Sequence, residues 1–265
     1  MHIVNFDEND LPIEDMETIG LAANGQLLLN VDDLKALLSG RRTGLLELRD
    51  LEAENVKIKS LNAKISLRHN DQGKADLLIH PIYRKAATPD FLDDNEAKAL
   101  QKGEVENYLK ITIDNNGNKK EMLVEYDSET KEFIISDTEK ILIPDMVNNE
   151  FLTAAQKENY RKGKEVQLAD GTKFNYAAVD KHGIRSDRIA LVASILIDGG
   201  LTYMVYKGLN ALFNKKRDEK AAAQNSKGYD LATQNMQAHE NVKGKEQQSP
   251  KDEQERGYTR TGRSR

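Results

Sequence analysis

Residues 63–79 read Ala-Lys-Ile-Ser-Leu-Arg-His-Asn-Asp-Gln-Gly-Lys-Ala-Asp-Leu-Leu-Ile. Apolar residues at 63, 65 and 67 alternate with polar ones, and this alternation predicts a β-strand with one buried face. Leu77 and Ile79 continue the pattern after Asn70-Asp71-Gln72-Gly73, a sequence typical of a turn. The stretch therefore predicts an antiparallel hairpin. Two further strands are predicted before it, at 46–48 and 56–58.

Two short helices are predicted on the N-terminal side of these strands. They are expected at 11–20 and 31–40. Each range ends in a glycine, Gly20 or Gly40, that can stop a helix. Asn30 or Asp32 would cap the second helix. Residues 1–85 are therefore expected to form an α+β domain in which two helices pack on a small antiparallel sheet.

The next part of the chain repeats itself at a spacing of 60 residues. Phe91-Leu92 begins a segment that ends in Lys102-Gly103, and Phe151-Leu152 begins one that ends in Lys162-Gly163. Each segment predicts a helix that stops at its glycine, followed by a short meander of strands. The shared order of elements favours a duplication over a chance match. We expect repeat modules at 86–147 and 148–186, with strands at 108–113, 121–126, 133–135, 165–168, 174–179 and near 184.

An apolar run follows at 189–206, and Asp198 with the two glycines after it lies in its middle. A membrane span needs about 20 apolar residues, and a carboxylate at the bilayer centre is costly. We interpret 187–213 as an apolar helical segment, either a buried helix pair or one helix with a break. Docking of this helix on a membrane surface is the alternative, because Lys215-Lys216-Arg217 follow it.

The end of the chain is polar. Residues 214–265 are rich in Gln, Lys, Glu, Ser and Asn. Such a composition buries too little apolar surface to offset the entropy of ordering. We predict a disordered tail with residual helix around 215–223.

Charge is unevenly distributed along the chain. The whole chain carries −5, and residues 214–265 hold twelve Lys and Arg against eight Asp and Glu, a local +4. Residues 1–213 therefore carry −9. Because phosphate binding needs clustered cations, any contact with nucleic acid is expected to be local or to lie in the tail.

Composition excludes several kinds of site. Hydrophobic residues make up 38% of the 265 residues and charged residues 31%, which suits several small cores better than one large core. The chain has no cysteine, and so no disulfide framework, thiolate zinc site or cysteine nucleophile. The lack of cysteine fits a reducing compartment, and the N-terminal residues lack the features of a signal peptide. We expect a cytoplasmic protein.

Patterns that carry chemistry are missing from the sequence. It contains no Gly-x-Ser-x-Gly, no Walker loop and no Gly-x-Gly-x-x-Gly. Among the five scattered histidines, His69 and His80 could face each other across the hairpin and hold a metal ion. Two surface imidazoles are the better interpretation. Asp114–Asn118 resembles a calcium loop superficially but lacks the spaced acids of an EF-hand, so a turn is favoured. We expect no catalytic residues, no metal, no cofactor and no small-molecule substrate, and therefore not an enzyme.

Two groups of arginines are candidate contacts for a ligand. Arg41 and Arg42 lie between a predicted helix and a predicted strand, where guanidinium groups could hold a phosphate or a partner's carboxylate. A solvated turn is the alternative there. The second group lies among glycines and Tyr258 at the C-terminus and suggests a nucleic-acid-contacting tail, or else a solubilising one. It consists of Arg256, Arg260, Arg263 and Arg265.

Several of these segments resemble known families. The stretches at 11–20, 37–43, 63–67 and 79–82 resemble an uncharacterised domain found in proteins of Bacteroidetes conjugative transposons. The two Phe-Leu…Lys-Gly segments are similar to a second domain of unknown function from the same elements. The two resemblances together cover about residues 1–185. The resemblance implies an accessory gene of mobile DNA and implies no catalytic residues.

The sequence therefore leads to two functional hypotheses. The first is a non-enzymatic binding or scaffold accessory protein of a mobile genetic element, acting on DNA or on a DNA-processing protein partner. The alternative is a membrane-surface-associated accessory protein docked through residues 189–213.

Overall fold

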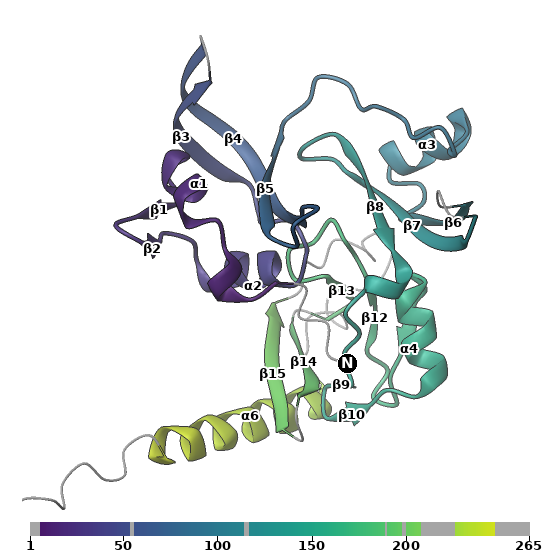
Figure 1. Cartoon of the computed structure of the whole chain (residues 1–265). Helices are drawn as coiled ribbons and strands as arrows, with labels where there is room; N and C mark the ends of the chain where they lie inside the picture. The colour runs from purple at the N-terminus through teal and green to yellow at the C-terminus, as the bar shows by residue number, and fades with distance from the viewer. Residues whose placement is uncertain are drawn as a thin grey trace, which may run out of the picture.

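The computed structural model describes residues 6–53, 56–113, 117–188, 190–197, 200–207 and 226–246. Short helices and small antiparallel sheets alternate along these residues (Figure 1), so the predicted α+β class is confirmed. In the part of the chain that the structure describes, no helix is long and apolar enough to cross a membrane.

The N-terminal part has the predicted helices and hairpin. After the 3-10 turn η1 (Glu8–Asp10) come α1 (Ile13–Thr18), the two-stranded ribbon β1 (Ala22–Ala23) and β2 (Gln26–Leu27), and α2 (Val31–Leu38). The sheet consists of β3 (Leu46–Ala53), β4 (Val56–His69) and β5 (Ala75–Pro81), with β4 in the centre. The strands predicted at 56–58 and 63–67 are one long strand, β4.

A single apolar core joins these helices to the sheet. The side chains of Met16 and Leu37 from the helices pack with Leu48 and Ile65 from the sheet, and all four are fully buried. The Asn30 side chain accepts a hydrogen bond from the backbone N–H of Asp33, so of the two proposed caps of α2 it is Asn30 that acts.

Both predicted helix-plus-meander segments are present. The first contains α3 (Asp94–Gln101) and the sheet of β6 (Asn107–Ile113), β7 (Lys119–Asp127) and β8 (Glu132–Asp137). The second contains α4 (Ala154–Arg161) and the sheet of β11 (Val166–Gln167), β12 (Lys173–Tyr176) and β13 (Ile184–Ser186). Between them lie the 3-10 turn η2 (Thr138–Lys140) and strands β9 (Met146–Val147) and β10 (Glu150–Phe151). The turn predicted at 114–118 lies mostly outside the described residues.

The two helices start and stop in the same way. Asp93 with Glu96, and Thr153 with Gln156, each form a capping box in which side chain and backbone bond reciprocally. Each helix then ends before a glycine at positive φ, Gly103 in one case and Gly163 in the other. These matching ends explain why the sequence pattern located both helices. Their origin by duplication stays a prediction.

The prediction of a helical segment at 187–213 is wrong for the residues that the structure describes. Two antiparallel strands, β14 (Ala190–Ile197) and β15 (Gly200–Lys207), stand there instead. Strand β14 also pairs with β9, giving the strand order β10-β9-β14-β15. Two apolar runs separated by exactly two residues, Asp198-Gly199, are a hairpin signal, which outweighs the helical interpretation of an apolar stretch. Residues 208–213 lie outside the described residues.

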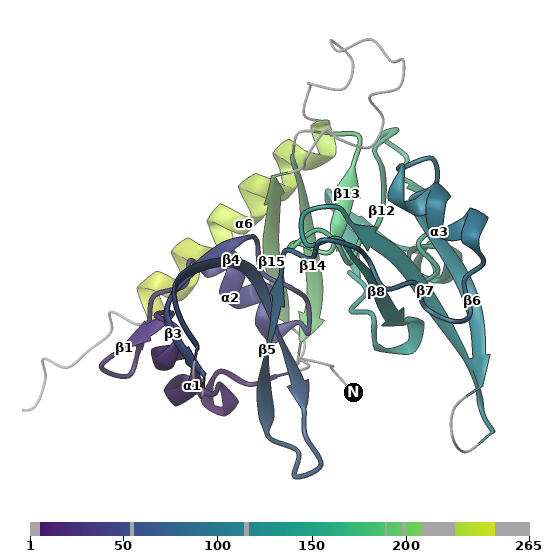
Figure 2. The same ribbon diagram turned by 90° about the horizontal axis from the view of Figure 1, so that it is seen from above.

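The prediction of disorder over 214–265 needs correction for part of that range. Residues Lys227–Glu246 form helix α6, which projects past β14 and β15 (Figures 1 and 2). The Ser226 hydroxyl accepts a hydrogen bond from the N–H of Tyr229, and Ala232 is 1% exposed against the body. An N-cap and a small buried anchor thus order the start of this polar helix. The residual helix predicted at 215–223 lies outside the described residues.

Candidate functional site

The end of helix α2 directs Arg41 and Arg42 away from the helix axis. Gly40 has φ of 72°, its N–H donates to the carbonyl of Leu37, and the N–H of Arg41 donates to that of Ala36. This pair of bonds is the Schellman arrangement, which terminates a helix through a residue in the left-handed region. The two arginines therefore leave a rigid corner, and they take opposite directions.

The side chain of Arg41 reaches the loop between β12 and β13. Its Nε donates to the backbone carbonyl of Lys181 at 3.1 Å. Gly183 has φ of 73°, and a Cβ at this position would lie 2.9 Å from Cδ of Arg41. A side chain at Gly183 would therefore obstruct the path of Arg41, so this glycine keeps the arginine in place.

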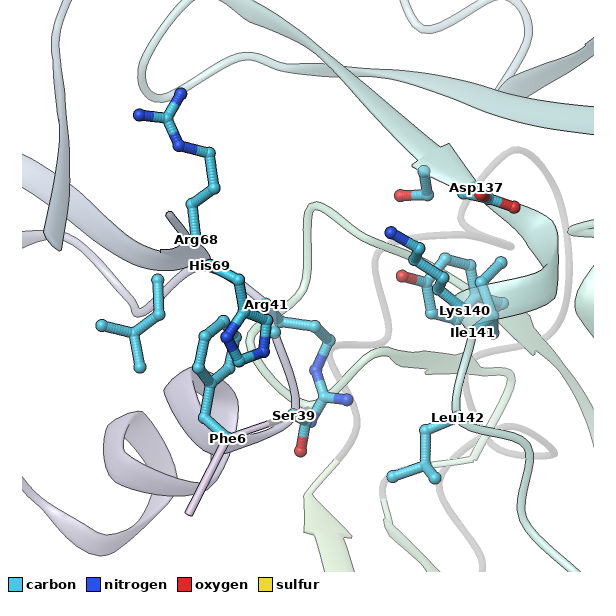
Figure 3. A pocket seen from close by; sticks show the side chains of 13 residues that line it. Phe6, Ser39, Arg41, Arg68, His69, Asp137, Lys140, Ile141 and Leu142 are labelled. Atoms are coloured by element: carbon cyan, nitrogen blue, oxygen red, sulfur yellow. The ribbon is translucent and has the colours of Figure 1, made fainter. Parts of the chain in front are cut away.

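Arg41 lines a cavity of about 520 Å³ between the N-terminal helices and sheet on one side and the two helix-plus-meander segments on the other. Figure 3 shows Arg41 and Lys140 on opposite walls, with Arg68 at the edge. Neither Arg68 nor Lys140 has an ion-pair partner among the described residues, and Asp137 is the one carboxylate in the lining. We call this cavity the Arg41 cleft. Its three cationic side chains against one carboxylate favour an anionic ligand.

The Arg41 cleft also has an apolar side. Phe6 stacks on His69 with ring centroids 4.3 Å apart, and Leu67, Ile141 and Leu142 complete the apolar lining. A cavity with an apolar floor and a few placed polar groups is typical of a binding site for a ligand of mixed character. This cleft would suit an anionic group attached to a flat or apolar one.

Tyr176 adds a neutral donor to the Arg41 cleft. Burial, and then the nearby carboxylate of Glu125, raise the pKa of Tyr176 to about 12. The phenol therefore keeps its proton at neutral pH and can donate a hydrogen bond rather than act as a base. In this cleft the arrangement suits binding of an anion and supplies no activated nucleophile.

Arg42 points away from the cleft into a cluster of ion pairs. Its guanidinium lies 2.8 Å from Oε2 of Glu132 and 3.9 Å from Oδ2 of Asp127. Lys64, almost fully buried, contacts the same Asp127 oxygen at 2.8 Å and Glu129 at 2.7 Å. We call these five residues the clasp, because they join the sheet of the N-terminal domain to the β7–β8 hairpin.

His80 extends the clasp. Its ring bonds to the hydroxyl of Ser66 at 2.8 Å and lies 3.4 Å from Glu132. Burial, and then the charge of Arg42, lower the pKa of His80. Register pairs His80 with Lys64 and His69 with Ala75, so the two histidines do not face each other across the hairpin. No group of three or more possible metal ligands occurs among the residues that the structure describes.

The structure thus separates the residues that the sequence singled out. Arg41 lines a cationic cleft, whereas Arg42 is engaged by carboxylates of the same chain. The second group of candidates, Arg256, Arg260, Arg263 and Arg265, lies outside the described residues. Arg68 and Lys140 were missed, because they come from the end of β4 and from η2, and no local pattern connects them with Arg41.

Comparison with known protein families finds a match for part of the chain. Residues 6–90 match the family described as "Protein of unknown function (DUF4099)". No curated protein and no solved structure matches the chain. The matched range contains α1, α2 and the β3-β4-β5 sheet, and with them Arg41 and Arg68. The matched region therefore supplies one wall of the cleft, and residues beyond it supply the other.

Proposed function

We propose that the chain is a non-enzymatic binding or scaffold protein of a mobile genetic element that acts on DNA or on a DNA-processing protein partner. The observation that carries the proposal is the Arg41 cleft, where Arg41, Arg68 and Lys140 surround a cavity with one carboxylate. Clustered cations in an otherwise acidic body are what a local phosphate contact requires. The resemblance to mobile-element proteins supplies the setting.

DNA is the first ligand to test because the cleft combines cations with apolar walls. Phosphates would meet the cations, and an unpaired base could stack on the exposed ring of His69, which itself stacks on buried Phe6. A protein partner that presents a carboxylate beside an apolar residue would use the same groups. The DNA hypothesis and the protein-partner hypothesis predict the same contact residues and different ligands.

The membrane-surface alternative has lost the helix on which it rested. Residues 190–197 and 200–207 are strands, and the side chains of Leu191, Val192 and Ala193 are buried. Buried side chains on a paired strand are not available to enter a bilayer surface. We therefore give priority to the DNA or protein partner.

Fluorescence anisotropy of labelled single- and double-stranded DNA tests the proposal. The full-length protein is compared at low salt with Arg41→Gln/Arg68→Gln/Lys140→Gln and with a chain ending at Glu246, which lacks the four terminal arginines. We expect the triple variant to bind at least about tenfold more weakly, since it removes three phosphate contacts. The chain ending at Glu246 then measures the share of the tail.

A matched control keeps net charge from deciding the result. Lys35→Gln/Lys59→Gln/Lys74→Gln removes the same three charges from exposed positions outside the cleft. Equal weakening in both triple variants would show only a general charge effect and would contradict the site. If the full-length protein binds neither DNA, capture of a protein partner that depends on Arg41 becomes the remaining form of the proposal.

A further inference from the structure

A second cationic cleft lies on a different part of the molecule. It has a volume of about 440 Å³ and is formed by the chain after β5, helix α3 and the β7–β8 hairpin. It shares no residue with the Arg41 cleft. We infer that this second cleft is a phosphate-binding site, and the inference rests on the proposed function in taking DNA as the source of the phosphate.

The charge of the second cleft is the first reason. Arg84 and Lys85 enter it from the segment after β5, Lys98 from α3, and Lys131 from the turn between β7 and β8. The only acidic residue in the lining is Asp94. The local charge is therefore +3, although residues 1–213 as a whole carry −9.

None of these four cations has an ion-pair partner among the residues that the structure describes. Lysines on other elements do have an ion-pair partner. They are Lys110 with Glu96, Lys157 with Asp145, and Lys173 with Glu165. Four cations gathered around one cavity with a single carboxylate, that of Asp94, repel one another. A bound anion would relieve that repulsion, and a phosphate, with several charged oxygens, can contact more than one of them.

Neutral donors complete the second cleft. The hydroxyls of Thr88 and Tyr126 and the amide of Gln101 belong to its lining. Burial, and then Asp127, raise the pKa of Tyr126, so its phenol keeps the proton that it would donate. On α3, Lys98 and Gln101 are three residues apart and so project from the same side of the helix. Together these groups offer donors from three separate elements to the oxygens of one phosphate.

Nuclear magnetic resonance of the full-length protein tests the site directly, with inorganic pyrophosphate as the probe. We expect pyrophosphate to shift the backbone amide signals of residues 84–88, 97–101 and 131. In Lys98→Gln/Lys131→Gln, whose two substitutions are at exposed positions, the apparent affinity should fall about tenfold. The control Lys35→Gln/Lys74→Gln removes two exposed lysines elsewhere and should bind like the wild type.

Two results would overturn the site. One is an absence of shifts around the second cleft in the wild type, and the other is equal affinity of wild type and Lys98→Gln/Lys131→Gln. Because pyrophosphate is read out at named amides, this test does not depend on whether the protein binds DNA.

A second titration, with a short oligothymidylate, identifies the source of the phosphate. Shifts of the same amides, and a logarithmic salt slope that is smaller by about 1.4 in Lys98→Gln/Lys131→Gln, support a DNA strand in the second cleft. If pyrophosphate shifts these amides and the oligonucleotide does not, the phosphate site stands and its assignment to DNA is overturned. If Arg41→Gln/Arg68→Gln/Lys140→Gln binds DNA as tightly as the wild type while the amides of the second cleft shift as expected, only the assignment of the Arg41 cleft is rejected.

Discussion

Arg41 and Arg42 are neighbours in the sequence and lie in opposite electrostatic surroundings. Arg42 lies in the clasp, where Glu132 and Asp127 balance its charge. Arg41 lies in a cleft that it shares with two further cations and one carboxylate. The difference shows that the carboxylates placed around an arginine decide whether it stabilises the fold or remains available to a ligand. The clasp should therefore control stability and the cleft should control binding.

Replacement of Lys64 should have the largest effect on stability. Its Nζ contacts Asp127 and Glu129, and both Lys64 and Asp127 are buried. Lys64→Ala would leave buried Asp127 with two backbone N–H donors, from Glu129 and Thr130, and with the more distant Arg42 as its remaining cation among the described residues. Removing one partner of a buried ion pair costs about 3–5 kcal/mol. Urea unfolding followed by circular dichroism measures this change in the free energy of unfolding.

The control for Lys64 lies on the same strand. Lys59 is exposed on β4, so Lys59→Ala should change the free energy of unfolding by less than about 0.5 kcal/mol. Equal effects of the two substitutions would show that the clasp adds nothing to stability.

A second buried carboxylate on β7 should make stability depend on pH. Glu125, two residues before Asp127, is fully buried and has Arg185 at 3.6 Å and the N–H of Ala178 as partners. Burial raises the pKa of Glu125 from 4.5 to about 7. Between these values the folded protein holds a proton that the unfolded chain has released, so stability falls as the pH rises from about 4.5 to about 7.

The expected loss is roughly 3 kcal/mol over that range, since each pKa unit corresponds to about 1.4 kcal/mol. The measurement is urea unfolding of wild type and Glu125→Gln at several pH values. Glutamine can still accept the hydrogen bond from Ala178 and does not titrate. The wild type should therefore lose stability relative to Glu125→Gln as the pH rises, and a difference that stays constant with pH would contradict the prediction.

The comparison of β14 with α3 shows which part of the fold the sequence could predict. Helix α3 carries local signals at both ends, Asp93 with Glu96 at its start and Gly103 after its end. Strand β14 is covered on both faces, so Leu191, Val192 and Ala193 are all buried and the sequence shows no alternation. An apolar run without a period does not separate a strand from a helix, and only Asp198-Gly199 indicated the hairpin.

The candidate site was less predictable than the fold for a different physical reason. A cationic cleft is a property of tertiary structure, and residues 41, 68 and 140 meet only after three segments have packed together. The sequence marked Arg41 and Arg42 equally. The carboxylates that engage Arg42 come from β7 and β8, and no local pattern shows where they lie.

Arg42→Gln should have an intermediate effect. The side chain of Arg42 is 13% exposed, and its loss removes the closest ion pair of Glu132. Because Glu132 is partly open to water, we expect a loss of about 1–2 kcal/mol in the free energy of unfolding. The pKa of His80 should also rise, since Arg42 is the second cause that lowers it after burial. Urea unfolding and a histidine titration by nuclear magnetic resonance measure the two effects. An unchanged pKa of His80 would contradict the electrostatic interaction between Arg42 and His80.

Of these substitutions, Arg41→Gln should have the smallest effect on stability. It should weaken DNA binding more than Arg42→Gln does. Its charge has no carboxylate partner among the described residues, and it loses one hydrogen bond, to the carbonyl of Lys181. We expect a change of less than about 1 kcal/mol in the free energy of unfolding. Arg42→Gln makes the same substitution one position away. Comparing the two variants therefore separates ligand binding in the cleft from stabilisation by the clasp. Weaker DNA binding in Arg41→Gln alone, with greater destabilisation in Arg42→Gln alone, would support the division between cleft and clasp. The reverse pattern would mean that the clasp, and not the cleft, holds the ligand.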